Sequence, residues 1–295
     1  MGSFMHRFIG VSIAVLALCA CSKDKSADPE ATGAAQSGTP AAMKLYVFDC
    51  GQMEMADLGP FDRGGAYNGR PGSGLVTCYL IRHPDGDFLW DAGLPDAIAE
   101  NPEGVAEGGF KITVPKTLAS QLAEIGVKPA DIEFFSISHS HFDHVGNGNL
   151  FAGSTFIVQK AERAHMFRDA ARADARSFAA YDKLETAKMR EIEGDHDVFG
   201  DGKVMIVSTP GHTPGHSSLL IRLENYGPFL LTGDLYHFTE AREKRTIPVF
   251  NTDPEETLRS MDKFESLASE TGAWVMIQHE ASDYAKVKHS PEYLD

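Results

Sequence analysis

The sequence contains few cysteines and little positive charge for its length. Four of the 295 residues are cysteine. Two of these, Cys19 and Cys21, lie at the end of the N-terminal apolar segment, so at most one disulfide can form in the remainder. Lysine and arginine number 27 against 42 aspartates and glutamates, giving a net charge of −15. This balance argues against nucleic acid as a partner, which needs clustered basic side chains. It favours a neutral or weakly charged substrate over an anion.

The N-terminus carries an apolar run that is too short to span a bilayer. This run, Phe8 to Ala20, follows Arg7 and is typical of a secretory signal peptide. Its end, LCAC, resembles the lipobox of bacterial lipoproteins, in which the last cysteine, here Cys21, carries the lipid; an ordinary cleaved signal is the alternative. Ser22 in place of aspartate resembles lipoproteins of the outer membrane. We therefore predict a signal peptide over 1–20 and a periplasmic, lipid-anchored protein at the outer membrane.

The chain after the lipid attachment site divides into a tether and one domain. Residues 21–42 are mostly small and polar, which predicts a flexible tether. Residues 43–295 have no internal repeat or second linker and form one predicted domain. Its two cysteines, Cys50 and Cys78, lie in apolar strand-like runs, so we expect buried free thiols. Pairing in an oxidising periplasm is the alternative.

Short apolar runs alternate with turns and helical stretches along this domain, which indicates an α+β class. The Asp85-Gly86 pair lies between two β-rich runs and predicts a hairpin. The apolar residues of 253–269 recur at helical spacing after an Asp-Pro-Glu start. The expected strands are 45–48, 77–82, 88–93, 133–138, 155–159, 203–212, 217–223, 228–234 and 274–279, and the expected helices are 116–125, one or two within 160–191, and 253–269.

The segment HSHFDH, residues 139–144, directly follows the expected strand 133–138. Three imidazoles and a carboxylate this close together in a loop are costly unless a divalent metal binds them. Alternate residues at a strand end face the same way, so His139 and His141 can converge on one ion. Asp143 and His144 follow a bend and can address a second ion. A polar surface loop with chance histidines is the alternative interpretation.

Three further polar residues lie at the ends of expected strands. His212 follows a strand in TPGHTPGH, Asp234 ends LLTGD and His279 ends VMIQH. Open sheets place functional groups at strand ends. Each residue alone is more often a cap or turn residue. Together with the HSHFDH loop they provide seven donors, which suits two adjacent metal ions.

With these motifs the sequence resembles the metallo-β-lactamase superfamily, and specifically the quorum-quenching N-acyl-homoserine lactone lactonases, over most of residues 44–294. The resemblance implies an αββα sandwich, with two mixed sheets flanked by helices and the metals at one edge. It also implies a hydrolase that opens the lactone ring of these small molecules. The matching segments are KLYVFDCG, CYLIRHPDG, WDAGLPD, HSHFDHVGN, STPGHTPGHSSLLI, FNTDPEETLRSM and HSPEYL.

The resemblance also assigns roles to individual residues. It implies two Zn²⁺ or other divalent ions, with Asp234 bridging them. Asp143 and Asp234 are then catalytic groups as well as ligands. Asp91, in WDAG, corresponds to a carboxylate that orients a ligand histidine, and His216 has no ligand role. One ion would be held by His139, His141 and His212, and the other by Asp143, His144 and His279.

One position departs from the family pattern. These lactonases commonly carry a tyrosine three residues after the bridging aspartate, placed to contact the substrate. Here His237 occupies that place and Tyr236 precedes it. Either side chain can donate a hydrogen bond to a developing oxyanion, and a plain packing role for Tyr236 is the alternative.

Several other functions share these ligands or this fold. A glyoxalase II-like thioesterase or a phosphodiesterase would keep all seven ligands. A class B β-lactamase would carry cysteine at the place of Asp234, and a flavodiiron-like module would add a flavin domain, for which the sequence has no counterpart. Two adjacent cations lower the pKa of a shared water to about 7, which favours hydrolysis. We expect Met53, Met55 and Phe142 to line an apolar groove for the acyl chain.

Overall fold

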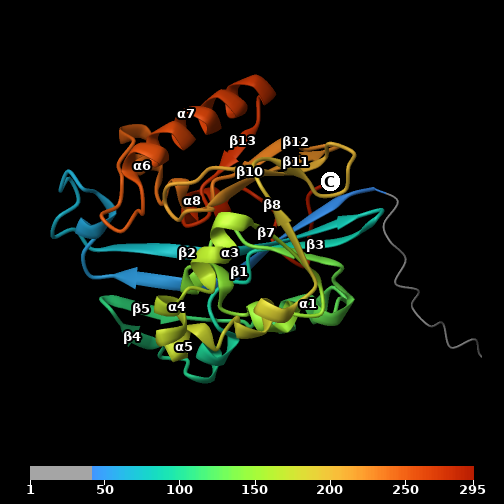
Figure 1. Cartoon of the computed structure of the whole chain (residues 1–295), viewed down its shortest axis with the longest axis horizontal. Helices are drawn as coiled ribbons and strands as arrows, with labels where there is room; N and C mark the ends of the chain where they lie inside the picture. The colour runs from blue at the N-terminus through green and yellow to red at the C-terminus, as the bar shows by residue number, and fades with distance from the viewer. Residues whose placement is uncertain (1–41) are drawn as a thin grey trace, which may run out of the picture. The chain divides into compact units, whose positions relative to one another are not determined.

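Two mixed β-sheets packed face to face form the centre of the fold, with helices on both outer faces (Figure 1). This computed structural model describes residues 42–295. The predicted signal peptide, Cys21 and nearly all of the predicted tether lie outside these residues. Within the described residues no helix is both long enough and apolar enough to cross a membrane. The layers confirm the predicted αββα sandwich and α+β class.

The larger sheet has eight strands. The β2–β3 hairpin predicted from Asp85-Gly86 is present, with His83 paired to Gly86. Antiparallel pairing joins β4, β5, β1, β2 and β3, whereas β3, β6, β7 and β8 are parallel. The sequence did not predict β4 and β5. The strand order is β4 (Val105–Glu107), β5 (Phe110–Thr113), β1 (Lys44–Met55), β2 (Gly72–His83), β3 (Gly86–Trp90), β6 (Phe134–Ser136), β7 (Thr155–Gln159) and β8 (Met189–Ile192).

The smaller sheet has five strands, of which only β12 and β13 pair in parallel. Its β11 spans the residues predicted from sequence, 217–223. The expected strands 203–212, 228–234 and 274–279 are each shorter in the structure, because their last residues leave the sheet to form the loops of the functional site. The strand order is β13 (Trp274–Met276), β12 (Gly227–Leu231), β11 (Ser217–Leu223), β10 (Val204–Ser208) and β9 (His196–Asp197).

Strand β1 shows how the core is built on both faces of the larger sheet. Leu45 and Val47 point into the layer between the sheets, where they join apolar residues of both. Tyr46 and Phe48 point the opposite way, into the core beneath the helices. Successive strand residues alternate between faces, so a strand buried on both sides reads as a continuous apolar run.

Helix α7 (Pro254–Thr271) covers the outer face of the smaller sheet (Figure 1). The Asp253 side chain caps its first turn by accepting a hydrogen bond from the backbone N–H of Glu256. The helix ends at Gly272, which adopts a left-handed conformation. This confirms the helix predicted over 253–269. The other α-helices are α1 (Leu118–Glu124), α2 (Phe142–Val145), α3 (Lys160–Met166), α4 (Asp169–Ala173), α5 (Ala175–Phe178), α6 (Thr239–Lys244) and α8 (Ala281–Tyr284).

The prediction of one or two helices within 160–191 is wrong. That segment forms α3, α4 and α5, then a 3₁₀ turn over Asp182–Thr186, then the start of β8. Asp174 has a non-helical backbone, and its side chain accepts a hydrogen bond from the backbone N–H of Ser177. Such local bonds offer the backbone an alternative to continuing a helix.

Cys50 on β1 and Cys78 on β2 form a disulfide, so the prediction of free thiols is wrong. The two strands are neighbours, and a bulge between Asp49 and Gly51 shifts their register. The two Cα atoms therefore lie 5.9 Å apart, a normal spacing for a disulfide. Gly93 packs against this bond: a Cβ there would lie 2.4 Å from Cys50 Cβ, and its φ of +64° also requires glycine.

We expect the Cys50→Ala/Cys78→Ala double variant to be less stable by about 3–4 kcal/mol. The bond closes a loop with a sequence separation of 28 residues, and loop-closure entropy gives this magnitude. Urea unfolding of the oxidised protein, the reduced protein and the double variant measures the difference. Reductant should not change the double variant, and equal stability of the oxidised and reduced proteins would contradict the prediction.

Candidate metal centre

The ends of strands from both sheets converge at one edge of the sandwich. The segments that follow β6, β10, β12 and β13 carry the residues predicted to bind metal, with Asp143 and His144 on the short helix α2. The loop after β3 carries Asp91. All seven predicted ligands therefore come together: they are His139, His141, Asp143, His144, His212, Asp234 and His279.

His139, His141 and His212 form a first group of donors, which we call cluster 1. His139 Nε2 lies 2.8 Å from His141 Nδ1 and 3.2 Å from His212 Nε2. His212 Nε2 lies 3.1 Å from His141 Nδ1. Three ring nitrogens thus face one another across a space suited to a single ion.

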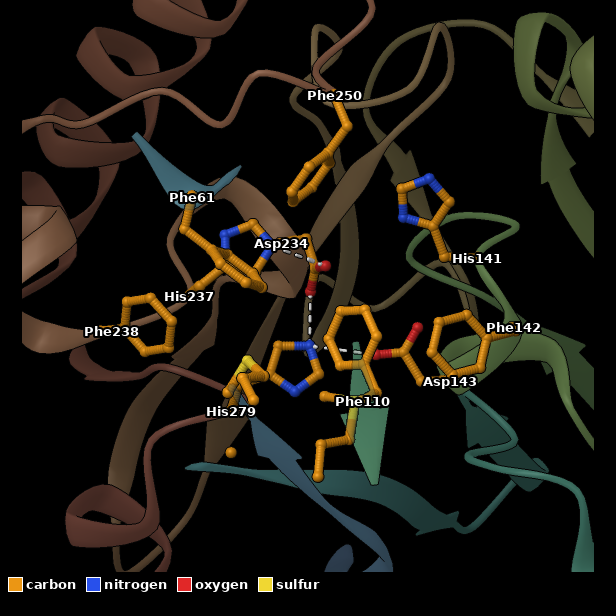
Figure 2. Close-up of a pocket in the computed structure, with 13 residues that line it drawn as sticks. Phe61, Phe110, His141, Phe142, Asp143, Asp234, His237, Phe238, Phe250 and His279 are labelled. Atoms are coloured by element: carbon orange, nitrogen blue, oxygen red, sulfur yellow. Dashed lines mark hydrogen bonds and ion pairs between the residues drawn. The ribbon is translucent and has the colours of Figure 1, made fainter. Parts of the chain in front are cut away.

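Asp143, His144 and His279 form a second group, cluster 2. The Nε2 atoms of His144 and His279 lie 3.2 Å apart, and Asp143 Oδ2 lies 3.7 Å from each. Asp234 lies between the clusters (Figure 2). Its Oδ1 is 3.1 Å from His144 and 2.9 Å from His279, while its Oδ2 is 3.6 Å from His139 and 3.4 Å from His212. Each carboxylate oxygen of Asp234 therefore faces the ring nitrogens of one cluster.

The hydrogen bonds on the outer sides of the rings show that this donor set fits metal ions. Where the outer ring nitrogen donates a proton to an oxygen, the inner nitrogen of the neutral ring carries a lone pair. Inner lone pairs about 3 Å apart repel one another unless a cation lies among them. Histidine and carboxylate donors in this number are the usual ligands of zinc. The outer bonds are His212 Nδ1 to Asn251 Oδ1 (2.8 Å), His279 Nδ1 to the Leu75 carbonyl (2.8 Å) and His144 Nδ1 to Asp91 Oδ2 (3.0 Å).

The protonation states of the site also suit cations. Burial lowers the pKa of His139 and His141 well below the usual value, so both imidazoles are neutral. Burial would raise the pKa of Asp234, but the surrounding histidines outweigh it and hold this pKa well below its ordinary range. Burial opposes protonation of His144 as well, yet Asp234 and Asp143 raise its pKa. Asp143 and Asp234 therefore stabilise a positive charge in cluster 2. A bound metal ion would supply that charge and displace the proton from His144.

Asp91 orients the His144 ring, as predicted. It is fully buried and accepts hydrogen bonds from the Ser138 backbone N–H (2.6 Å), the Ser138 hydroxyl (3.0 Å) and Gln278 Nε2 (2.8 Å). Together with His144 Nδ1, these donors occupy both carboxylate oxygens. Its φ of 61° is uncommon for a residue other than glycine and is held by these bonds. The Gln278 Oε1 in turn accepts from the backbone N–H of Gly233, beside Asp234.

We expect Asp91→Asn to reduce metal affinity and kcat/KM by about 10–100-fold, the usual cost of losing a partner of a ligand histidine. The amide nitrogen of asparagine cannot accept a hydrogen bond. In either oxygen position it would face a hydrogen-bond donor of Ser138 or Gln278, so at least one bond would be lost. Metal content and hydrolytic activity measure the effect. Asp85→Asn, in the exposed β2–β3 turn, is the control. Unchanged metal affinity would show that His144 does not depend on Asp91.

His216 is buried beside the clusters and forms hydrogen bonds to the backbone with both ring nitrogens. Burial lowers its pKa to about 3, so the ring is neutral. Its Nδ1 donates to the Thr209 carbonyl (2.9 Å), and its Nε2 accepts from the backbone N–H of Asp234 (2.9 Å). His216 thus fixes the backbone that carries Asp234, which lies between the clusters.

An apolar cavity of about 230 Å³ opens directly onto the two clusters (Figure 2). Met53, Met55 and Phe142, which were predicted to line it, do so. The sequence did not identify the other aromatic residues, because they come from loops and strands far apart in the chain. These are Phe61, Phe110, Phe238 and Phe250.

The structure separates His237 from Tyr236. His237 lines the cavity, and its Nε2 lies 3.0 Å from Asp234 Oδ2 (Figure 2). Burial lowers its pKa, so the ring is neutral and Nε2 carries the proton of this hydrogen bond. Tyr236 packs against Phe264 of α7. Its hydroxyl lies near Glu265 and not in the cavity.

Fold and donor set together define a metal-dependent hydrolase built on an αββα sandwich. The family model described as "Metallo-beta-lactamase superfamily" matches residues 71–279, and the chain belongs to this superfamily. It is 31% identical over 233 residues to the N-acyl homoserine lactonase AttM of Azorhizobium caulinodans, covering 75% of this chain and 87% of that protein. It is 32% identical over 226 residues to an N-acyl homoserine lactonase of a Bacillus species, covering 74% and 86%. Within the superfamily, the chain belongs to this lactonase family.

A solved structure agrees with this assignment. It shows an N-acyl homoserine lactone hydrolase with the product N-hexanoyl-L-homoserine bound at its catalytic metal centre. This structure superimposes with a TM-score of 0.73 at 27% identity, and the match covers 86% of this chain and 99% of that one.

Proposed function

We propose that this protein opens the lactone ring of N-acyl-homoserine lactones with two bound zinc ions. The observation that carries the proposal is the apolar, aromatic cavity that opens directly onto two clusters of metal-binding side chains. Such a site accepts a molecule with a small polar ring and an apolar chain. The net charge of −15 also favours a neutral substrate of this kind. The lactonase family to which the chain belongs supports the same reaction.

The two clusters contain the residues that would hold the metals. Cluster 1 would bind one ion, cluster 2 the other, and Asp234 would contact both, one oxygen to each. When bound, two such ions lower the pKa of a nearby water to about 7 and polarise a carbonyl oxygen. Both effects are needed to hydrolyse an ester bond at neutral pH.

The protein's own side chains would position the substrate and move protons. Water adds to the ester carbonyl carbon, the ring C–O bond breaks, and the ring oxygen leaves as an alcohol that must gain a proton. Asp234 lies where its carboxylate can take up the proton of the attacking water and return it to the leaving oxygen. Asp143 lies beside it in cluster 2. The Nε2–H of His237 donates to Asp234 at the wall of the same cavity, and with substrate bound it would shift to the oxyanion.

A substrate panel tests the proposal. The purified zinc-loaded protein should hydrolyse an acyl-homoserine lactone with a kcat/KM far above those for a nitrocefin-type lactam, an acyl thioester and a phosphodiester. Preference for the thioester would indicate a glyoxalase II-like enzyme, and preference for one of the others would indicate the corresponding hydrolase. Two equivalents of zinc without any hydrolysis would support a metal-binding module instead.

We also propose that the protein is a periplasmic lipoprotein anchored through Cys21. Two observations support this proposal: the signal-like run that ends in LCAC, and the disulfide between Cys50 and Cys78. Disulfides persist in oxidising compartments such as the periplasm. Cys21→Ser should move the protein from the membrane fraction to the soluble periplasmic fraction. Unchanged membrane association would reject the lipid anchor and leave the hydrolase proposal intact.

A further inference from the structure

Glu162 is a buried carboxylate that accepts hydrogen bonds from both loops of cluster 1. It lies in the first turn of α3 and is 1% exposed. Its Oε1 accepts from the Ser140 backbone N–H (2.8 Å) and the Ser140 hydroxyl (2.6 Å). Its Oε2 accepts from the Thr213 hydroxyl (2.7 Å) and the Gly215 backbone N–H (3.0 Å). Each oxygen therefore holds one loop.

These two loops supply all three histidines of cluster 1. Ser140 separates His139 from His141, and Thr213 directly follows His212. The hydrogen bonds to Glu162 thus fix residues immediately next to every imidazole of the cluster. Bonds to an ionised acceptor are shorter and about twice as strong as bonds between neutral groups, so this contact constrains the spacing between the loops tightly.

The neighbourhood of Glu162 is adapted to this contact. Gly215 approaches so closely that a Cβ there would lie 2.3 Å from the Glu162 nitrogen and 2.6 Å from its Cβ. Only glycine allows the loop to reach the carboxylate. Burying a carboxylate costs free energy that burying a neutral side chain does not. The carboxylate is therefore explained by the number of hydrogen bonds that it accepts. A carboxylate is the group that can accept four bonds divided between two oxygens.

We propose that Glu162 is a positioning residue for the metal at cluster 1, which sets the separation of the His139–His141 loop from the His212 loop. Cluster 2 is held by a different network, in which Asp91 orients His144 and bonds to Gln278. The direct hydrogen bonds of Glu162 are all to residues next to the histidines of cluster 1, so we expect its main effect at that metal site. The inference rests on the proposed metal-dependent function but concerns metal affinity, whatever the substrate is.

Glu162→Gln tests the proposal, because the side chain keeps its size while its amide nitrogen cannot accept from one of the loops. Competition with a chromogenic chelator gives the two zinc dissociation constants of the protein. We expect one constant to rise by about 10–100-fold and the other to stay unchanged. In a His279→Ala background, which disables cluster 2, Glu162→Gln should weaken the remaining zinc site by the same factor.

Milder variants separate positioning from folding. Thr213→Val removes one hydroxyl donor at constant shape and should weaken the same zinc site by a smaller factor, whereas Thr213→Ser keeps the hydroxyl and should bind as the wild type does. Glu191→Gln, on the exposed side of β8, is the matched control. The metal-free Glu162→Gln protein should be folded, with a melting temperature lowered by a few degrees because one loop loses its acceptor.

Three outcomes would overturn the proposal. The first is that both zinc dissociation constants stay unchanged in Glu162→Gln, and the second is that both rise equally. The third is that Glu162→Gln weakens zinc binding in the wild-type background but not in the His279→Ala background. A wild-type protein that binds two zinc ions but hydrolyses no lactone would instead overturn the proposed function, and would leave the role of Glu162 standing.

Discussion

His212→Ala should lose metal and lactone hydrolysis together. The imidazole of His212 supplies one of the three nitrogens of cluster 1, and its Nε2 lies within 3.2 Å of both others. Metal ions contribute several kcal/mol of transition-state stabilisation, which corresponds to a rate loss of more than about 1,000-fold. Without His212 the first ion keeps only His139, His141 and one oxygen of the shared Asp234 carboxylate, so it loses one of its four protein donors and binds more weakly.

Metal quantification and kinetics on the same preparation check this expectation. The variant should retain less than two equivalents of metal, and chelation of the wild-type protein should abolish its activity until zinc is restored. His196→Ala, a half-buried histidine of β9 outside both clusters, should keep metal and activity. Full activity of the wild-type protein after complete removal of metal would contradict the whole assignment.

Local sequence signals predicted much of the fold because several elements depend on short stretches of chain. The run TFIVQ, 155–159, has a β-rich apolar centre, follows a turn and forms β7 at those residues. Asp253 and the proline that follows it specify the start of α7. The metal ligands were predictable for a related reason. The HSHFDH segment, His212, Asp234 and His279 each come within a few residues of the end of an apolar strand, and strand ends in packed sheets meet at a common edge.

Features that depend on long-range pairing were not predictable in this way. The disulfide exists because β1 and β2 pair in a register that brings Cys50 and Cys78 together, whereas each cysteine alone reads as an apolar strand residue. The bond between Gln278 and Asp91 joins residues 187 positions apart. Strands β4 and β5 form the outer edge of the larger sheet, and their side chains outside Ile112 are mostly half-buried or exposed, so they carry a weak apolar pattern.

The choice between Tyr236 and His237 illustrates the limit at a single position. Both are consistent with the spacing after Asp234, and either can donate a hydrogen bond. The backbone at Tyr236 is extended, with φ −139° and ψ 133°, so successive side chains point to opposite sides. Once Tyr236 packs under α7, His237 must face the cavity. This outcome depends on the packing of α7, which the local sequence does not contain.

We therefore expect His237→Ala to lower kcat by about 100- to 1,000-fold. Losing one donor to a developing oxyanion typically costs about 2.7–4 kcal/mol. The neutral His237 ring carries its proton on Nε2, 3.0 Å from Asp234 Oδ2, at the wall of the cavity that opens onto both clusters. His237 belongs to neither metal cluster, so the variant should retain two equivalents of metal. This combination of lost turnover and intact metal content distinguishes it from His212→Ala.

Tyr236→Phe is the matched control, because it removes a hydroxyl from the adjacent residue on the opposite side of the loop. That variant should keep kcat within about twofold, since its hydroxyl lies near Glu265 and outside the cavity. A large loss in Tyr236→Phe with full activity in His237→Ala would make Tyr236 the donor. Full activity in both would mean that the metals alone stabilise the oxyanion. Loss of metal from His237→Ala would place His237 in the coordination shell, beside the Asp234 oxygen that it already contacts.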